Sequence, residues 1–171
     1  SIVVIGSGLA AYSLANSIKK IDVDTAITLI TRDGGENYSK PMISTGFTKK
    51  FEPDQLATQT AENMSDNLGI AVRTRTEVAS LDTASSEVVL TSGERVPYSS
   101  LVLTLGAELI RPPIGGDAAS EVMGVNDLDD YRRFRDTLTQ TGVKKVAVIG
   151  AGLIGCEFTN DLLNGCLLYT S

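Results

Sequence analysis

The sequence predicts an α/β fold in which helices cover a parallel sheet, with a small β-hairpin meander in the middle of the chain. Two observations predict it. At both ends of the chain, an apolar run typical of a buried strand leads through a Gly-x-Gly turn into an amphipathic helical pattern, at 2–18 and at 146–163. Between them, short β-type runs are separated by turn residues. A strand that enters a helix through such a turn is typical of the Rossmann-like fold.

The first of these units occupies the N-terminus. Ile2–Ile5 is a continuous β-branched run that ends at a glycine, which predicts a buried parallel strand. The helix that follows ends at Lys19 and Lys20, where cations are favourable. Its apolar face consists of Ala11, Leu14, Ala15 and Ile18. A second strand at 26–31 completes a βαβ unit of about 30 residues.

The middle of the chain alternates loops with short elements. Residues 33–48 are rich in Gly, Asn, Ser, Lys and Pro, which predicts a long, functional loop. A helix is expected at 54–67, with Gly69 as its stop. The β-type runs that follow lie at 70–75, 88–91, 95–98 and 101–105, and the turn at 92–94 joins the middle two as a hairpin.

The last third of the chain begins with a linker and repeats the N-terminal pattern. Residues 110–117, IRPPIGGD, have the Pro and Gly density of a linker. Asn126 or Asp127 then caps a helix that Gly142 ends. The apolar side of this helix consists of Leu128, Tyr131, Phe134 and Leu138. A buried strand at 146–149 and a helix at 153–163 follow.

Composition excludes several classes of function. Of the 171 residues, 42% are apolar and 21% charged, which is ordinary for a globular protein. The net charge of −6 argues against nucleic acid as a partner, because non-specific binding to phosphates needs clustered cations. The sequence has no His, which excludes Ser-His triads and His metal sites from it. No apolar run approaches the roughly 18 residues of a membrane span, so no membrane partner is expected.

The cysteines predict the compartment. Cys156 and Cys166 match neither CxxC nor a zinc spacing, so no metal site is expected. A pair so sparse favours a reducing compartment, and we therefore expect a cytoplasmic protein. The apolar N-terminus lacks a preceding basic segment and is interrupted by two glycines, which argues against a signal peptide.

The first glycine turn has the spacing of a dinucleotide-binding fingerprint, and its positions are Gly6, Ser7, Gly8, Leu9, Ala10 and Ala11. Gly6 permits the tight turn, and Gly8 lets the backbone approach a pyrophosphate. Ala11 is still small enough for close packing of the helix on the strand. The free N–H groups and the dipole of the helix start favour the phosphate anion.

In such folds an acidic residue about 20 positions further on usually binds the ribose hydroxyls. Asp33 lies 22 residues after Ala11 (33 minus 11), but beyond the expected end of the strand. It is therefore either that ligand or a solvated loop carboxylate. Thr31 and Arg32 beside it are candidates for a hydrogen bond to the nucleotide or for covering the adenine.

The second turn fills every glycine position of the fingerprint, with Gly150, Gly152 and Gly155. Leu153 and Ile154 lie at the helix start, and Glu157 lies just inside the helix. Two fingerprints that are 144 residues apart (150 minus 6) predict two nucleotide sites in one enzyme.

Two such motifs at this distance resemble the two-dinucleotide-binding-domain flavoproteins of the pyridine nucleotide-disulfide oxidoreductase superfamily, in which an NAD(P)H domain interrupts an FAD domain. Residues 101–117, LVLTLGAELIRPPIGGD, are similar to the family's segment that covers the flavin. The resemblance implies flavin contacts for Leu105, Gly106 and Ala107, although Thr104-Leu105-Gly106 departs from the family's Ala-Thr-Gly. It also implies that the backbone of Val78 holds the adenine.

The loop at 38–45, YSKPMIST, indicates the subfamily. Disulfide reductases of this superfamily carry a CxxxxC pair in the corresponding region, and this loop has no cysteine, so dithiol exchange is not expected. The Y-x-[KR]-P-x-[LI]-S pattern is similar to the loop of ferredoxin and rubredoxin reductases. Together with GAELIRPP, NDLDDYRRFR and GAGLIGCEF it resembles bacterial rubredoxin:NAD+ reductases over residues 2 to about 164.

Lys40 is the candidate catalytic residue, and the reason is electrostatic. A flavin that accepts a hydride gains electron density, and a fixed cation nearby stabilises that charge. Pro41 restricts the backbone beside it and would hold the loop against the ring. The alternative is that Lys40 is a solvated lysine on a mobile loop.

The resemblance implies an oxidoreductase that passes electrons from NADH through FAD to a small iron or iron–sulfur protein such as rubredoxin. Two alternatives stay open. The same architecture serves NADH oxidases and the ferredoxin reductase components of oxygenases, although an oxidase would carry a reactive Cys near Ser44 and Thr45. The protein could also bind a nucleotide without turnover.

The resemblance further implies that the fold is truncated. Residues 1–115 would form the N-terminal part of an FAD-binding domain, and 116–171 an incomplete start of an NAD(P)H-binding domain. The final residues, CLLYTS, are either a truncated strand or foreign sequence. We expect these 171 residues alone to retain FAD weakly or not at all, and to show no turnover.

Overall fold

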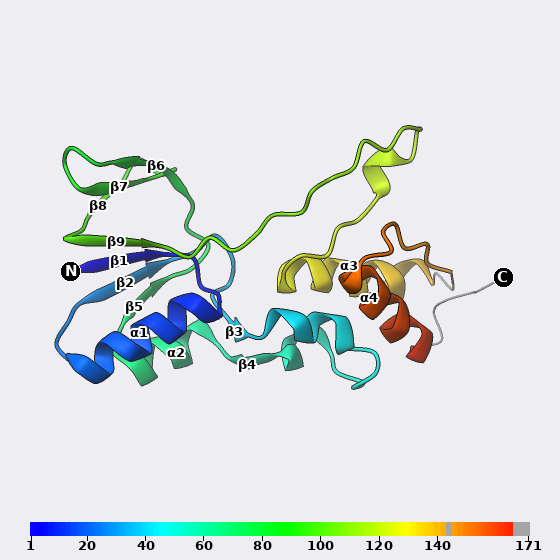
Figure 1. Cartoon of the computed structure of the whole chain (residues 1–171), viewed down its shortest axis with the longest axis horizontal. Coiled ribbons are helices and arrows are strands. Elements are labelled where there is room, and N and C mark those ends of the chain that lie inside the picture. Colours follow the sequence, from blue (N-terminus) through cyan, green and yellow to red (C-terminus); the bar gives the residue numbers. More distant parts are fainter. Residues whose placement is uncertain (143–144, 166–171) are drawn as a thin grey trace. The chain divides into compact units, whose positions relative to one another are not determined.

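The computed structural model describes residues 1–142 and 145–165 (Figure 1), and these fall into two units that are each discontinuous in sequence. The first unit consists of Ser1–Tyr38 and Ala57–Ala107. The second consists of Ser39–Leu56 and the chain from Glu108 onward. Cys166 and the CLLYTS tail lie outside the described residues.

A four-stranded parallel sheet in the order β5-β2-β1-β9 forms the centre of the first unit. Ile5 of β1 lies beside Ile30 of β2 and Leu103 of β9, so these three strands end at one edge. The strands are β1 (Ile2–Ile5), β2 (Ile27–Ile30), β5 (Ala71–Arg73) and β9 (Ser100–Leu103). This confirms the predicted α/β fold with a parallel sheet.

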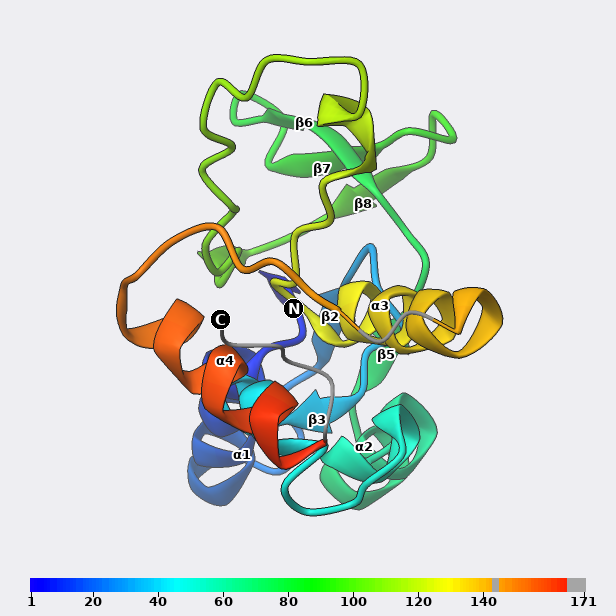
Figure 2. The same cartoon turned by 90° about the vertical axis from the view of Figure 1, so that its right-hand side faces the viewer.

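Both faces of this sheet are covered, which explains why its strands read as unbroken apolar runs. Successive side chains of a strand point to opposite faces. Val4 and Leu29 belong to the core beneath the helices α1 (Leu9–Ile21) and α2 (Ala61–Leu68). Val3, Ile5 and Ile30 instead pack with Val88 and Leu90 of a second, antiparallel sheet. Figures 1 and 2 show the helices and this second sheet on opposite sides of β1 and β2.

The second sheet is the predicted meander, with the order β6-β7-β8. β7 (Glu87–Leu90) and β8 (Arg95–Pro97) form the expected hairpin. β6 (Val78–Asp82) was not predicted as a strand. Three consecutive residues of it, Ala79, Ser80 and Leu81, are exposed, and its ladder with β7 is irregular between Val78 and Ser80. An edge strand with so little burial shows no apolar alternation in the sequence.

The helix predicted at 54–67 is wrong in its first half. The chain there forms a 3₁₀ turn, η2 (Pro53–Leu56), and then β4 (Ala57–Gln59), which pairs with β3 (Asn37–Tyr38). The helix α2 begins only at Ala61, because the Thr60 side chain accepts a hydrogen bond from the Asn63 N–H at 3.2 Å. Its predicted stop is confirmed, since Gly69 adopts a left-handed conformation with φ +61°.

The regular elements of the second unit, in its described residues, are all helical. The predicted loop at 33–48 contains a 3₁₀ helix, η1 (Lys40–Thr45), and a short 3₁₀ turn, η3 (Ala119–Glu121), precedes α3 (Leu128–Thr141). Asp127 caps α3 by accepting a hydrogen bond from the Asp130 N–H at 2.8 Å, and Gly142 ends it. The buried face of α3 consists of Leu128, Tyr131 and Phe134. The last helix, α4 (Leu153–Asn164), confirms the prediction at 153–163.

The strand predicted at 146–149 is not formed. These residues have no regular structure, and Ala147, Val148 and Ile149 are exposed. A parallel strand is held by hydrogen bonds to neighbouring strands. Among the residues that the structure describes, the second unit contains no strand that could pair with this one. The apolar pattern alone therefore does not produce a strand here.

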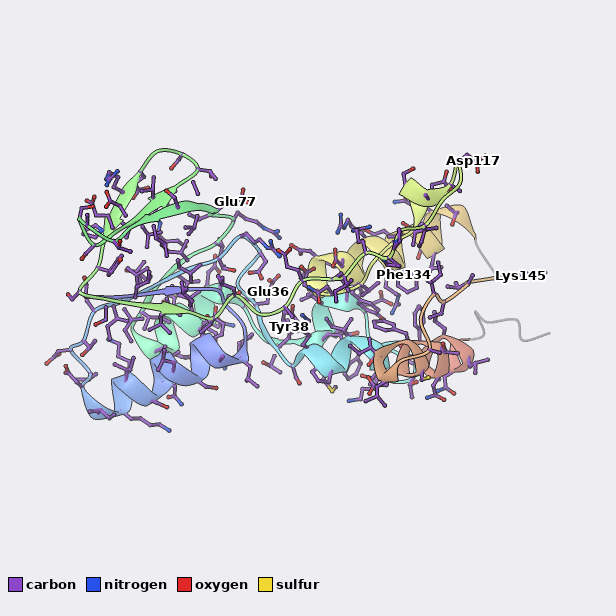
Figure 3. All side chains as sticks on the ribbon, turned by 45° about the horizontal axis from the view of Figure 1, so that its top comes forward. Glu36, Tyr38, Glu77, Asp117, Phe134 and Lys145 are labelled. Carbon is purple, nitrogen blue, oxygen red and sulfur yellow. The ribbon has the colours of Figure 1, made fainter. Side chains whose placement is uncertain are left out.

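The linker predicted at 110–117 is confirmed as irregular chain. Every residue from Leu105 to Ala118 is exposed, and no helix or strand forms between β9 and η3. Figure 3 shows Asp117 at the outer turn of this segment.

Candidate nucleotide-binding sites

The first glycine turn joins the end of β1 to the start of α1. Gly6 has φ +109°, and a Cβ on it would lie 2.2 Å from the Thr104 carbonyl oxygen, so no other residue fits. Gly8 is the N-cap residue of α1, and no side chain caps the helix there. A Cβ on Gly8 would meet nothing within 4 Å. The turn therefore presents open space next to uncapped N–H groups, which is the geometry that an anion requires.

Asp33 is held against this turn by hydrogen bonds. Its Oδ1 accepts from the Ser7 hydroxyl at 2.8 Å, from the Thr31 hydroxyl at 2.7 Å and from the Gly35 N–H at 2.9 Å. Ser7 and Thr31 are 5% and 4% exposed. The structure thus brings Ser7, Thr31 and Asp33 together from the ends of two adjacent strands. A carboxylate fixed there is suited to binding vicinal hydroxyls.

Tyr12 supports the loop that follows Asp33. This side chain is 3% exposed, and its hydroxyl donates a hydrogen bond to the Gly35 carbonyl oxygen. Burial, reinforced by the negative charges of Asp33 and Glu36, raises the pKa of Tyr12 to about 12. The phenol therefore remains a neutral donor across the physiological pH range.

Other predicted residues of the first unit lie along the same sheet or near it. Leu105, Gly106 and Ala107 follow β9 directly and are exposed. Thr104, just before them, donates from its N–H and its hydroxyl to the Ile5 carbonyl oxygen, at 2.8 and 2.9 Å. Val78 starts β6 and is half-buried, while Arg32 is exposed.

The second glycine turn repeats the backbone of the first. Gly150 has φ +118°, and the N-cap Gly152 has φ −75° and ψ 176°, close to the −68° and 179° of Gly8. Again no side chain caps the helix. A Cβ on Gly155 would lie 2.0 Å from the Gly150 carbonyl oxygen, so the third glycine is required here. The predicted repeat of the turn and helix is confirmed.

An open depression of about 390 Å³ lies beside this turn. Its lining residues are Val148, Gly150, Ala151, Gly155, Cys156, Thr159, Asn160 and Leu163. Leu153 and Ile154 at the helix start are 86% and 67% exposed. Glu157, one turn further on, accepts a hydrogen bond from the Ser44 hydroxyl at 2.9 Å.

The comparison with known families agrees with these two turns. The sequence profile of the pyridine nucleotide-disulphide oxidoreductases matches residues 1–165. The chain belongs to this family. Both glycine turns lie within the matched residues.

Two relatives match nearly the whole of this chain. The chain is 46% identical over 164 residues to the rubredoxin-NAD(+) reductase of Alcanivorax borkumensis, a match that covers 96% of this chain and 42% of that protein. It is 40% identical to the rubredoxin-NAD(+) reductase of Acinetobacter baylyi, over 94% of this chain and 42% of that protein. The chain thus spans less than half the length of these relatives.

A solved structure shows the shared fold. The NADH:rubredoxin oxidoreductase from Clostridium acetobutylicum matches with a TM-score of 0.80 and 22% sequence identity. The match covers 98% of this chain and 43% of that one. At this identity the likeness establishes the fold that the family shares.

In this chain, Lys40 and Pro41 lie in the second unit, at the start of η1, and both are exposed. Their role toward a flavin stays a prediction, as do the cofactor contacts of the other candidate residues. Sequence reasoning missed Asp161, which is 1% exposed on α4 and accepts two backbone N–H groups. No local signal in the sequence marks Asp161, because the N–H groups that it accepts lie more than 110 residues away.

A membrane-spanning helix and a cluster of metal ligands are both absent from the described residues. None of the helices within residues 1–142 and 145–165 combines the length and apolar character that crossing a membrane would take. In the same part of the chain, no three His, Cys, Asp or Glu side chains lie together as metal ligands would.

Proposed function

We propose that this chain is part of an FAD-dependent oxidoreductase that passes electrons from NADH through FAD to a small redox protein, rubredoxin being the preferred acceptor. The observation that carries the proposal is the 46% identity to a rubredoxin-NAD(+) reductase over nearly the whole chain. The two glycine turns supply a site for each nucleotide. The low cysteine content favours the cytoplasm as its compartment.

The first turn is the proposed FAD site. Gly6 to Ala11 offer open backbone N–H groups for the pyrophosphate, and Asp33 offers a fixed carboxylate for the ribose. The residues present fit the group, since a Cβ at Gly8 would meet nothing within 4 Å. Thr31 and Arg32, Val78, and Leu105 to Ala107 are proposed to contact the rest of FAD. When bound, FAD supplies the conversion of hydride transfer into single-electron transfer.

The second turn is the proposed NADH site, and residues 116–171 are the proposed start of the NAD(P)H-binding domain, after an FAD-binding part at 1–115. The uncapped start of α4 at Gly152 suits the pyrophosphate. Gly150, Leu153, Ile154, Gly155 and Glu157 would line the nucleotide. Lys40 is the proposed catalytic residue, because a cation held by Pro41 and η1 stabilises an electron-rich ring.

The experiment that tests the function uses the complete reading frame that contains this sequence. A yellow preparation whose flavin absorbance is bleached by NADH, and which then reduces rubredoxin, is the expected result. A colourless protein that binds only NAD(H) would contradict it and favour a non-catalytic nucleotide-binding protein. Rapid oxygen consumption without an acceptor would favour an NADH oxidase, and preference for a [2Fe–2S] ferredoxin would favour an oxygenase component.

Surface charge supports a prediction about the acceptor. Lys49 and Lys50 lie together in an exposed turn that follows η1. Basic side chains on such a turn attract an acidic electron-transfer protein and raise its association rate. In the double variant Lys49→Glu, Lys50→Glu we expect rubredoxin-coupled turnover to fall about tenfold at low salt, with NADH bleaching of the flavin unchanged.

The matched control is Lys19→Glu, Lys20→Glu, which makes the same change in charge at the end of α1. It should leave rubredoxin coupling within about twofold of the parent protein. The difference between the two variants should shrink as NaCl is raised. Equal coupling in both variants would reject this docking site and leave the flavin chemistry untouched.

A further inference from the structure

The helix that starts at the second glycine turn holds a segment distant in sequence. Three side chains of α4, at Glu157, Asp161 and Asn164, hydrogen bond to residues 44–48. The spacing of four and three residues places them on one face of the helix. The segment 44–51, which we name the basic segment, follows Lys40 in η1 and contains Lys49 and Lys50.

Asp161 makes the central contact. Its Oδ2 accepts the Phe47 N–H at 3.0 Å and its Oδ1 accepts the Thr48 N–H at 2.7 Å. These two N–H groups open a turn whose other end closes by the Phe51 N–H donating to the Gly46 carbonyl oxygen at 2.9 Å. Asp161 thus caps this turn from another helix. Because the carboxylate is 1% exposed, water does not replace these bonds readily.

Helix α3 holds the other side of the basic segment. The Arg135 guanidinium lies 4.3 Å from the Phe47 ring centroid and donates to the Phe51 carbonyl oxygen at 3.1 Å. Gly46 packs on Tyr131, so closely that a Cβ would lie 2.1 Å from the phenol oxygen. Because one side of the basic segment is packed against α3, its backbone conformation depends mainly on the hydrogen bonds to α4.

We propose that Asp161 is a positioning residue that couples nucleotide binding at Gly150–Gly155 to the conformation of the basic segment and of Lys40. Asp161 lies nine residues after Gly152 (161 minus 152), about 13 Å along a rigid helix. A pyrophosphate on the helix start that displaces α4 therefore displaces Asp161, and through it the Phe47 and Thr48 amides. The coupling rests on the proposed function, whereas the capping of the turn does not.

The test uses amide NMR of the complete protein that contains this chain, first without nucleotide. In Asp161→Asn one carboxylate oxygen becomes an NH₂ group, which faces a backbone N–H instead of accepting from it. Either the Phe47 or the Thr48 amide should then lose its hydrogen-bonded shift and exchange with solvent at least about tenfold faster, because the remaining amide oxygen of the new side chain can still accept the other. Amides of β1 and β2 should not change. The matched control Asp136→Asn, on the exposed face of α3, should leave all of these amides unchanged.

A titration with NAD+ to millimolar concentration then tests the coupling. In the parent protein, the amides of Gly152 and Gly155 should shift, and those of Phe47 and Thr48 should shift with the same saturation. In Asp161→Asn the first pair should still shift, and the amide that has lost its hydrogen bond should not. If this variant loses the α3 amide signals altogether, the titration of the parent protein decides.

The outcomes separate the two proposals. Shifts at Gly152 and Gly155 without shifts at Phe47 and Thr48 overturn the coupling and leave the proposed function standing. No shift at Gly152 and Gly155 counts against the nucleotide site of the proposed function, and overturns the coupling with it. Unchanged exchange of Phe47 and Thr48 in Asp161→Asn overturns the positioning role itself.

Discussion

At the scale of single residues, the two glycine turns share their first two glycines and differ at the third glycine position. Gly155 cannot carry a Cβ because the Gly150 carbonyl oxygen is too close. Ala11 occupies the same position of the first turn and is completely buried with its methyl group in the helix-side core. The methyl group of Ala11 therefore contributes to the packing of the helix on the strand.

Gly6→Ala should destabilise the first unit. The substitution places a Cβ 2.2 Å from the Thr104 carbonyl oxygen, at a φ of +109° that L-residues rarely adopt. We expect a loss of about 2 kcal/mol or more in the free energy of unfolding, measured by urea denaturation. Gly8→Ala is the control, since its Cβ meets nothing within 4 Å, and should cost about 1 kcal/mol at most while weakening FAD binding. Equal losses in the two variants would contradict the role of Gly6.

The residue types at these turns could be predicted from the sequence, because turn geometry depends on a few neighbouring positions. The network around Asp33 could be predicted only as a candidate, since its partner Ser7 comes from the end of a different strand. Asp161 could not be predicted, because the N–H groups that it accepts are more than 110 residues away.

At the scale of elements, the sequence predicts the ends of helices reliably where a capping side chain or a glycine determines them. The helix ends at Asp127, Gly69 and Gly142 lie where they were predicted. Asp127 accepts a backbone N–H at the start of its helix, and the two glycines adopt the left-handed conformation that ends a helix. Predictions failed where a strand forms only if a neighbouring strand pairs with it. The run 146–149 has the apolar pattern of a strand but no strand beside it in the described part of the second unit. β6 has little pattern of its own and forms because β7 pairs with it.

The meander also carries an acid-sensitive charge cluster. Hydrogen bonds from Ser85 and Arg95 lower the pKa of Asp82, and hydrogen bonds from Arg95 and Ser85 lower the pKa of Glu87. A carboxylate whose pKa is lowered by folding adds stability above its ordinary pKa, and this is lost as the pH falls below it. The stabilisation should therefore decline as the pH falls through 4.5 for Glu87 and 3.8 for Asp82, and further below.

Arg95→Gln should lower the thermal midpoint at about pH 6, and this effect should shrink steadily as the pH falls below 3.8, because the carboxylates become protonated in both proteins. The effect should be small because all three side chains are accessible to solvent. Arg111→Gln, in the exposed segment after β9, is the control and should not shift the midpoint anywhere in this pH range. A difference between parent and Arg95→Gln that persists at acidic pH would exclude this cluster as its source.

At the scale of the whole molecule, the division into units could not be predicted. The expected boundary at 115 follows the chain, and as an assignment of cofactors it stays a prediction. The units of the structure are interleaved instead, because 39–56 packs with the chain after Glu108. Such a division depends on contacts between distant segments, for example Ser44 with Glu157, and sequence periodicity carries no information about them.

The exposed segment from Leu105 to Ala118 predicts where the native chain is cut. Proteases need about ten residues of accessible, irregular backbone, and this segment offers that. Thermolysin should cleave first before Leu109, Ile110 or Ile114, which are exposed, with the products identified by mass spectrometry. Trypsin should be slow there, because Arg111 precedes a proline. First cleavage inside α1 or α3 would contradict this predicted order of cleavage.

The placement of residues 39–56 in the second unit has a consequence for synthesis on the ribosome. The first unit has all of its strands once β9 has emerged, whereas the basic segment must wait for α4, more than 100 residues later. Until then the Phe47 and Thr48 amides and the buried face of η1 have no partner from α4. The first unit can therefore fold during translation while residues 39–56 still lack their contacts with α4, and these residues are open to proteases and chaperones until α4 has emerged.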